Sequence, residues 1–269
     1  MPELRLDHLT IDYPARDRGP AYRAVGGVSL TVAPGEFVSV VGPSGCGKTS
    51  LLHAVAGLVP AAAGTVSFGG TPIRGPGPER AVVFQHASLL PWRTVLGNVA
   101  YGLELRRVPR REARARARAM VELVGLGDAA SRYPHELSGG MQQRVNLARA
   151  LAPEPAVLLM DEPFAALDAQ TRDAMQAELL RIWAASRTSV LFVTHHIEEA
   201  VFLGDRVVVL SPGPGATVRE CVPVPFDRPR DTALRRTPGF VALADHVWST
   251  LAGARDRKAP HERANLETR

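Results

Sequence analysis

The stretch FVSVVGPSGCGKTSLLHAVAGL, Phe37–Leu58, decides the fold of this chain. A short apolar run leads into a glycine-rich loop, and an apolar segment that suits a helix follows at once. This order of strand, glycine loop and helix separates a phosphate-binding loop from a glycine turn that matches the motif by accident. The stretch therefore predicts an α/β domain that binds the phosphates of a nucleotide.

The spacing Gly42-x4-Gly47-Lys48-Thr49 assigns chemistry to this loop. Glycines let backbone N–H groups wrap phosphate oxygens, and the start of the following helix adds its positive end. Lys48 would neutralise the β- and γ-phosphate charge, and the Thr49 hydroxyl would bind Mg²⁺. We predict nucleotide contacts from Gly42, Ser44, Gly45, Cys46, Gly47, Lys48, Thr49 and Ser50.

The composition is that of an ordinary globular protein, with 269 residues, 45% hydrophobic, 22% charged and a net charge of +5. Two cysteines, Cys46 and Cys221, favour a reducing compartment over a disulfide framework. The N-terminus carries charges where a signal peptide would be apolar, and the apolar runs are too short to cross a bilayer. We expect a cytosolic protein that meets a membrane only through a partner.

The elements along the chain suggest one main domain with an appendage. An antiparallel β layer is expected before the loop, and a helical insertion about 88–152 is expected inside the α/β domain. The runs AVLLM and SVLFV suit buried parallel strands, and DRVVVLSPGPGATVRE suits a hairpin. We predict a domain over 1–225 and a C-terminal tail over 226–269, partly helical and disordered at its end.

Two carboxylates directly follow the run AVLLM. Asp161 could hold Mg²⁺ through water, and Glu162 could orient or deprotonate the attacking water. An Asp-Glu pair at a strand end is, on its own, more often a turn or a helix cap, but the upstream phosphate loop favours the catalytic interpretation. Gln85 follows the apolar run AVVF in the same way, and its amide could reach Mg²⁺ or water.

Histidine and tyrosine side chains complete the candidate site. His195 follows the apolar run SVLFVT and could contact the γ-phosphate, because strand ends in such sheets point to the ligand crevice. Its neighbour His196 leaves the choice between the two histidines open from chemistry alone. Tyr13 could stack on an adenine ring, and Tyr22 competes for that role.

Taken together, these motifs resemble the ATP-binding cassette (ABC) ATPases over roughly residues 3 to 220. LSGG in combination with the other motifs is very specific for that family. The resemblance implies ATP as the nucleotide and a P-loop core with an antiparallel β subdomain and an inserted helical subdomain. It is carried, in chain order, by GPSGCGKTS, Gln85, LSGGMQQR, LLMDEP, the ALD of Ala166 to Asp168, and the VTH of Val193 to His195.

The resemblance also implies a role for each residue. Glu162 would be the catalytic base, His195 the switch histidine, and Lys48 a third catalytic residue. The same comparison makes Tyr13 the adenine-stacking aromatic and Asp168 the aspartate at a dimer seam. Thr49, Gln85 and Asp161 would hold Mg²⁺. Two subunits of this family face each other head to tail, so Ser138, Gly139 and Gly140 would bind the ATP of a second, identical subunit.

Finer likenesses point to a subgroup of the family. GPGPER and ALDAQTRD resemble the ATPases of taurine, aliphatic sulfonate and nitrate importers, and the taurine type most. This implies a peripheral subunit at the cytoplasmic face of the inner membrane that docks a permease through Gln85–Asn98 and serves a solute-binding protein indirectly. Leu89, Leu90 and Trp92 fit a groove for a permease helix, although a self-packed loop would use the same residues.

Two alternatives and two departures stay open at this stage. A soluble ABC ATPase acting on nucleic acid or ribosomes is the rival function, but the second cassette or long coiled coil usual in that class is missing, so no specific nucleic acid is expected. The run Arg106–Met120 suits a solvated helix face, with contact to acidic lipid as the alternative. Met141 replaces the glutamine most common after LSGG, and His196 replaces a frequent acidic residue.

Overall fold

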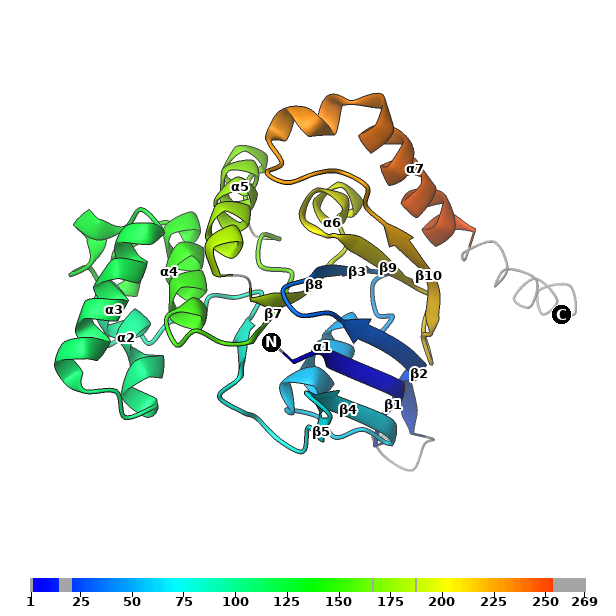
Figure 1. Ribbon diagram of the computed structural model, residues 1–269, viewed down its shortest axis with the longest axis horizontal. Helices are drawn as coiled ribbons and strands as arrows, with labels where there is room; N and C mark the ends of the chain where they lie inside the picture. The colour runs from blue at the N-terminus through cyan, green and yellow to red at the C-terminus, as the bar shows by residue number, and fades with distance from the viewer. Residues whose placement is uncertain (1, 15–20, 166, 187, 254–269) are drawn as a thin grey trace, which may run out of the picture.

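A computed structural model describes residues 2–14, 21–165, 167–186 and 188–253. Two sheets and their covering helices form the main body, and a group of helices forms a separate lobe beside it (Figure 1). The expected α/β fold with an antiparallel β subdomain and an inserted helical subdomain is thereby confirmed.

The antiparallel sheet has the strand order β2-β1-β4-β5. Alternating apolar side chains of β1 face the core, but the spacing shifts by one residue between Leu6 and Leu9, where His8 has a φ of 46°. This bulge keeps both leucines buried although they are three positions apart. The strands are β1 (Leu4–Tyr13), β2 (Tyr22–Val32), β4 (Ala63–Phe68) and β5 (Thr71–Pro72).

The second sheet has six strands in the order β10-β9-β3-β8-β7-β6. All neighbours pair in parallel except the edge strand β10, which forms the expected hairpin with β9. Every residue of β3, β7 and β8 is buried, as continuous apolar runs predict for strands covered on both faces. The strands are β3 (Phe37–Val41), β6 (Arg80–Val83), β7 (Val157–Asp161), β8 (Ser189–Thr194), β9 (Arg206–Leu210) and β10 (Val218–Pro223).

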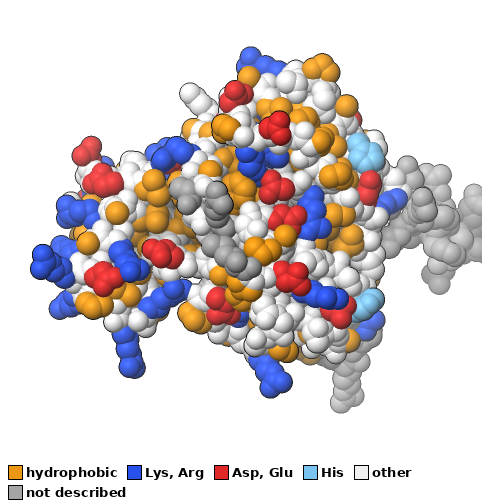
Figure 2. Space-filling view, in the orientation of Figure 1, with side chains coloured by type: hydrophobic (Ala, Val, Ile, Leu, Met, Phe, Trp, Pro, Cys, Tyr) orange, Lys and Arg blue, Asp and Glu red, His pale blue; other side chains and the backbone are white. Residues whose placement is uncertain are grey.

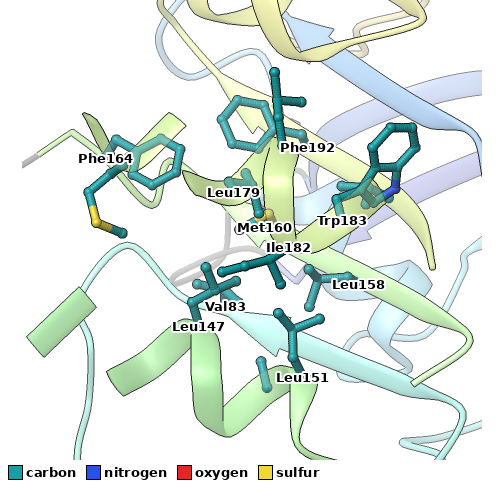
Figure 3. Packing of buried hydrophobic residues seen from close by; sticks show 14 of the residues in the cluster. Val83, Leu147, Leu151, Leu158, Met160, Phe164, Leu179, Ile182, Trp183 and Phe192 are labelled. Atoms are coloured by element: carbon teal, nitrogen blue, oxygen red, sulfur yellow. The ribbon is translucent and has the colours of Figure 1, made fainter. Parts of the chain in front are cut away.

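Helices on both faces of this sheet complete the core. The helices of the main body are α1 (Lys48–Ala56), α5 (Ala169–Ser186), α6 (Ile197–Leu203) and α7 (Pro238–Ala252), preceded by the 3₁₀ turn η3 (Thr232–Arg236). Side chains of β7, β8, α4 and α5 interlock around Met160 and Ile182 (Figure 3). Phe192 lies at one end of this cluster, with its ring centroid 5.8 Å from that of Phe37.

The lobe at the left of Figure 1 contains α2 (Val95–Leu105), α3 (Arg110–Leu123) and α4 (Gly139–Leu151), with 3₁₀ turns η1 (Gly127–Ala129) and η2 (Pro134–Glu136). Helix α3 buries Ala113, Ala117 and Val121. Its arginines are exposed, and Figure 2 shows basic side chains, with acidic ones among them, on the visible face of this lobe. The arginine run is therefore a solvent-facing helix surface.

The C-terminal segment packs on the main body. Helix α7 contacts α6 and β9, and Phe240 and Val247 are part of the main core cluster. The proposed boundary at residue 225 stays a prediction, and the expected disorder near the end falls on 254–269, outside the described residues. Among the described helices, none is long and apolar enough to span a membrane.

Candidate nucleotide site

The phosphate loop joins the end of β3 to the start of α1. Gly47 has a φ of 96° and caps α1 without a side-chain bond, so the first N–H groups of the helix stay available. The loop lines a cavity of about 1660 Å³ that also contacts Glu162, His195 and Arg172. The loop and the predicted catalytic residues therefore meet in one cavity, whereas Arg172 was not predicted from the sequence.

Lys48 is buried and its ammonium points back over the loop. Nζ donates to the carbonyl oxygens of Gly42 at 2.9 Å and Pro43 at 3.1 Å. A buried ammonium must be satisfied by acceptors, and two carbonyls do this while leaving one N–H for an incoming oxygen. The geometry therefore places a positive charge where phosphates would enter the loop.

Thr49, which lines the cavity, places its hydroxyl next to the carboxylate of Asp161. The Thr49 hydroxyl donates to Asp161 Oδ1 at 3.2 Å. Burial raises the pKa of the Asp161 carboxyl, and the bond from Thr49 opposes that rise. No cluster of three or more His, Cys, Asp or Glu that could hold a metal occurs in the described part of the chain. A hydroxyl and one carboxylate suit Mg²⁺, which usually binds through one or two carboxylates plus substrate phosphates.

Glu162 and His195 form a direct pair. His195 Nδ1 lies 2.8 Å from Glu162 Oε2, and the Glu162 side chain is only 19% exposed. The Glu162 backbone has a φ of 43°, an uncommon left-handed conformation for this residue type, and its N–H donates to Val193 O at 2.9 Å. Such strain persists where the surroundings enforce it, and it turns the carboxylate toward the histidine.

His196 is held differently from its neighbour. Its ring centroid lies 4.0 Å from that of His195, and its backbone N–H donates to Thr194 Oγ1 at 3.0 Å. Burial lowers the pKa of His196, and the nearby His195 and Arg172 lower it further. His195 contacts Glu162 through its ring, and this contact favours His195 over His196 as the switch residue.

The two candidate tyrosines lie in different surroundings. Tyr22 lines the cavity, and its hydroxyl donates to Gly45 O at 3.3 Å. The Tyr13 hydroxyl instead donates to Ser50 Oγ at 3.1 Å. The geometry of this single chain therefore favours Tyr22 as the aromatic side chain that would stack on adenine, and the assignment of Tyr13 to that role stays a prediction.

The LSGG segment lies on another element, at the start of α4. Ser138 caps the helix by accepting from the N–H of Met141 at 3.3 Å. The N–H groups of Gly139 and Gly140 have no protein acceptor among the described residues. The residues that line the cavity come from other segments, so one chain does not unite LSGG with its own phosphate loop.

Gln85 and Asp168 are not among the residues that line the cavity. The Gln85 side chain is exposed, and the backbone carbonyl of Gln85 accepts from Gln143 Nε2 at 2.9 Å. Gln143 also donates to Pro163 O at 2.6 Å, so it links the segment of Gln85 to the loop after Glu162. Asp168 is exposed and accepts from the N–H of Thr171, which lowers its pKa. Ala166 lies outside the described residues.

Known proteins resemble this chain in sequence over most of its length. The family model described as ABC transporter matches residues 25–165. The taurine import ATP-binding protein TauB of Chromobacterium violaceum is 48% identical over 96% of this chain and 99% of its own length. TauB of Mesorhizobium japonicum is 55% identical over 83% of this chain and 85% of its own.

A solved structure is similar to this chain in its fold as well. The dimeric structure of a post-hydrolysis state of an ATP-binding cassette, bound to ADP and Pi, has a TM-score of 0.71 and 30% identity. It covers 83% of this chain, and this chain covers all of it.

Replacing Gly47 with Ala should abolish tight nucleotide binding. A Cβ there would lie 2.6 Å from Ala24 O, in addition to the strain of the positive φ. Gly45 has a φ of 75° but open space around its Cβ position, so Gly45→Ala is the matched control for strain without collision. Titration with a fluorescent ATP analogue should show a much larger loss for Gly47→Ala. Equal losses of affinity in the two variants would show that the collision of the new Cβ with Ala24 O does not contribute to the effect.

Proposed function

We propose, from the premise that this chain belongs to the ABC transporter family and is an ATPase, that it powers the import of taurine or a related sulfonate or nitrate-like anion through a separate permease. The likeness to TauB over nearly the full length of both chains supports the solute class. The Glu162–His195 pair beside the phosphate loop is the observation that carries the ATPase chemistry.

Each catalytic residue has a role that its position supports. Glu162 would orient and deprotonate the attacking water, because its carboxylate faces the cavity and one oxygen is already held by His195. His195 would also contact the γ-phosphate. Lys48 would stabilise the charge that builds up on the phosphates during transfer. Thr49, Asp161 and Gln85 would hold Mg²⁺, which would supply positive charge to neutralise the phosphates.

The signature segment would complete the site of a second subunit. The free N–H groups of Gly139 and Gly140 lie at a helix N-terminus, where an anion is stabilised by both hydrogen bonds and the helix dipole. They lie outside the cavity of their own chain, which supports a head-to-tail homodimer with ATP between the subunits. Loss of the γ-phosphate would then remove a contact that holds the dimer together.

The loop before α2 is the proposed docking site for the permease. Buried Asn98 fixes the loop, accepting from Leu90 N at 2.8 Å and donating to the carbonyls of Leu90, Arg93 and Thr94. Leu89 packs against the core, whereas Trp92 is 72% exposed. The loop is thus partly self-packed, but it presents a rigid aromatic side chain of the kind that anchors a partner helix. Such docking would place the chain at the cytoplasmic face of the inner membrane.

Glu162→Gln should still bind ATP but hydrolyse it at least about a hundredfold more slowly, because an amide cannot accept the water proton. ATP should then convert the variant into a lasting dimer. Size-exclusion chromatography with ATP and a phosphate-release assay measure the two effects. Normal turnover by this variant would remove Glu162 from the catalytic role.

The solute and the docking site can be tested together in a reconstituted transporter. The chain, its permease and its solute-binding protein would be assembled in lipid, and taurine, other sulfonates and nitrate compared as stimulators of ATP hydrolysis. We expect taurine to stimulate most. Stimulation by none of these anions would contradict the proposed solute class.

In the same system, Trp92→Glu should weaken co-purification with the permease, because a charge would replace the apolar anchor. Leu105→Glu is the matched control, since Leu105 is 66% exposed on the same lobe but lies at the far end of α2. Equal co-purification of both variants would place the docking site elsewhere.

A further inference from the structure

A buried carboxyl group lines the same cavity as the Glu162–His195 pair. Glu199, in the first turn of α6, is 4% exposed. Thr194 Oγ1 donates to Glu199 Oε2, and Gln176 Nε2 donates to Oε1 at 2.6 Å. Burial raises the pKa of Glu199, and both hydrogen bonds act against that rise. Both oxygens of this side chain are therefore engaged by neighbours, as a buried carboxyl group requires.

Glu199 reaches the switch histidine through Thr194. Thr194 Oγ1, while donating to Glu199, accepts the backbone N–H of His196 at 3.0 Å. This bond fixes the peptide unit between His195 and His196, and so the direction in which the His195 side chain leaves the backbone. A shift of Thr194 would change the 2.8 Å contact between His195 and Glu162.

The far end of the network comes from the C-terminal segment. Arg235, in η3, donates to Gln176 Oε1 and to Asp173 Oδ1, the latter at 2.8 Å. Its guanidinium carbon also lies 4.4 Å from the ring centroid of Phe202. The side chain is only 17% exposed, so these contacts hold it in place.

Arg235 decides which way the Gln176 amide points. A guanidinium has only donors, so it must bind the amide oxygen, and the NH₂ group is then turned toward Glu199. Without Arg235 the buried amide oxygen would lose this donor, which is unfavourable, and the bond to Glu199 alone would hold the amide in place.

We propose that Arg235 is a positioning residue for ATP hydrolysis, acting through Gln176, Glu199 and Thr194 to hold His195 against Glu162. The inference rests on the proposed catalytic roles of Glu162 and His195. It gives the C-terminal segment a part in the reaction: that segment, which also lines the cavity, keeps the switch histidine aligned through neighbouring side chains.

The first test is the steady-state ATPase activity of full-length Arg235→Ala. Its kcat should fall roughly tenfold or more, because small misplacements of a catalytic group cost that much. Its KM for ATP should stay near the wild-type value, since the phosphate loop is untouched. Arg235→Lys should restore part of kcat because it keeps the charge near Asp173. Arg236→Ala is the matched control, since Arg236 is exposed, and it should behave as wild type.

A double-mutant comparison separates positioning from general damage. Thr194→Val breaks the same network near its other end. If both residues act through one network, the double variant should lose little more kcat than the worse single variant, whereas independent effects would multiply. Thermal unfolding of each variant corrects kcat for the folded fraction.

Three outcomes would overturn the inference: an unchanged kcat in Arg235→Ala, multiplicative losses in the double variant, or a loss explained by unfolding alone. Glu162→Gln measured in parallel keeps the two proposals apart. If Glu162→Gln is inactive while Arg235→Ala is unaffected, only the positioning role of Arg235 fails. If Glu162→Gln keeps full turnover, the catalytic assignment itself fails.

Discussion

The parallel pairing of β7, β8 and β3 is the constraint on which the site depends. Val41 pairs with Thr194, and Asp161 pairs with Val193, so all three strands end at one edge of the sheet. The phosphate loop follows β3, the two carboxylates lie at the end of β7, and the two histidines follow β8, so all three groups lie at that edge. Residues more than a hundred positions apart meet because backbone hydrogen bonds between the strands fix their register. The left-handed backbone conformation of Glu162 then sets the direction of its side chain.

The same architecture separates LSGG from the phosphate loop within one chain. The proposed catalytic residues lie at the ends of sheet strands, whereas LSGG lies at the start of α4 in the helical lobe and does not line the cavity of its own phosphate loop. A helix N-terminus with unsatisfied N–H groups is stable in water, but it binds a phosphate far better once water is excluded. In the proposed head-to-tail arrangement the two glycine-rich segments belong to different sites, which two copies of the chain would bring together.

Much of this could be predicted from the sequence, because the strands are continuous apolar runs and the loop has fixed spacing. FVSVV, AVLLM and SVLFV all became buried parallel strands, and the expected hairpin formed. Single-residue assignments were harder. The competition between Tyr13 and Tyr22 depends on where the loop closes, and the contacts of Gln143 and Arg235 join segments far apart in the chain. No local pattern marks such contacts, because only tertiary packing creates them.

The claim that LSGG acts on the neighbour's nucleotide can be tested most directly by mixing two inactive variants. Lys48→Ala disables the phosphate loop, and Ser138→Arg blocks the signature. If the site is shared, a mixed dimer contains one pairing of an intact loop with an intact signature, and mixing should raise ATP hydrolysis well above the sum of the separate variants. If the mixture shows only that sum, although mixed dimers form, each chain works alone and the account is contradicted.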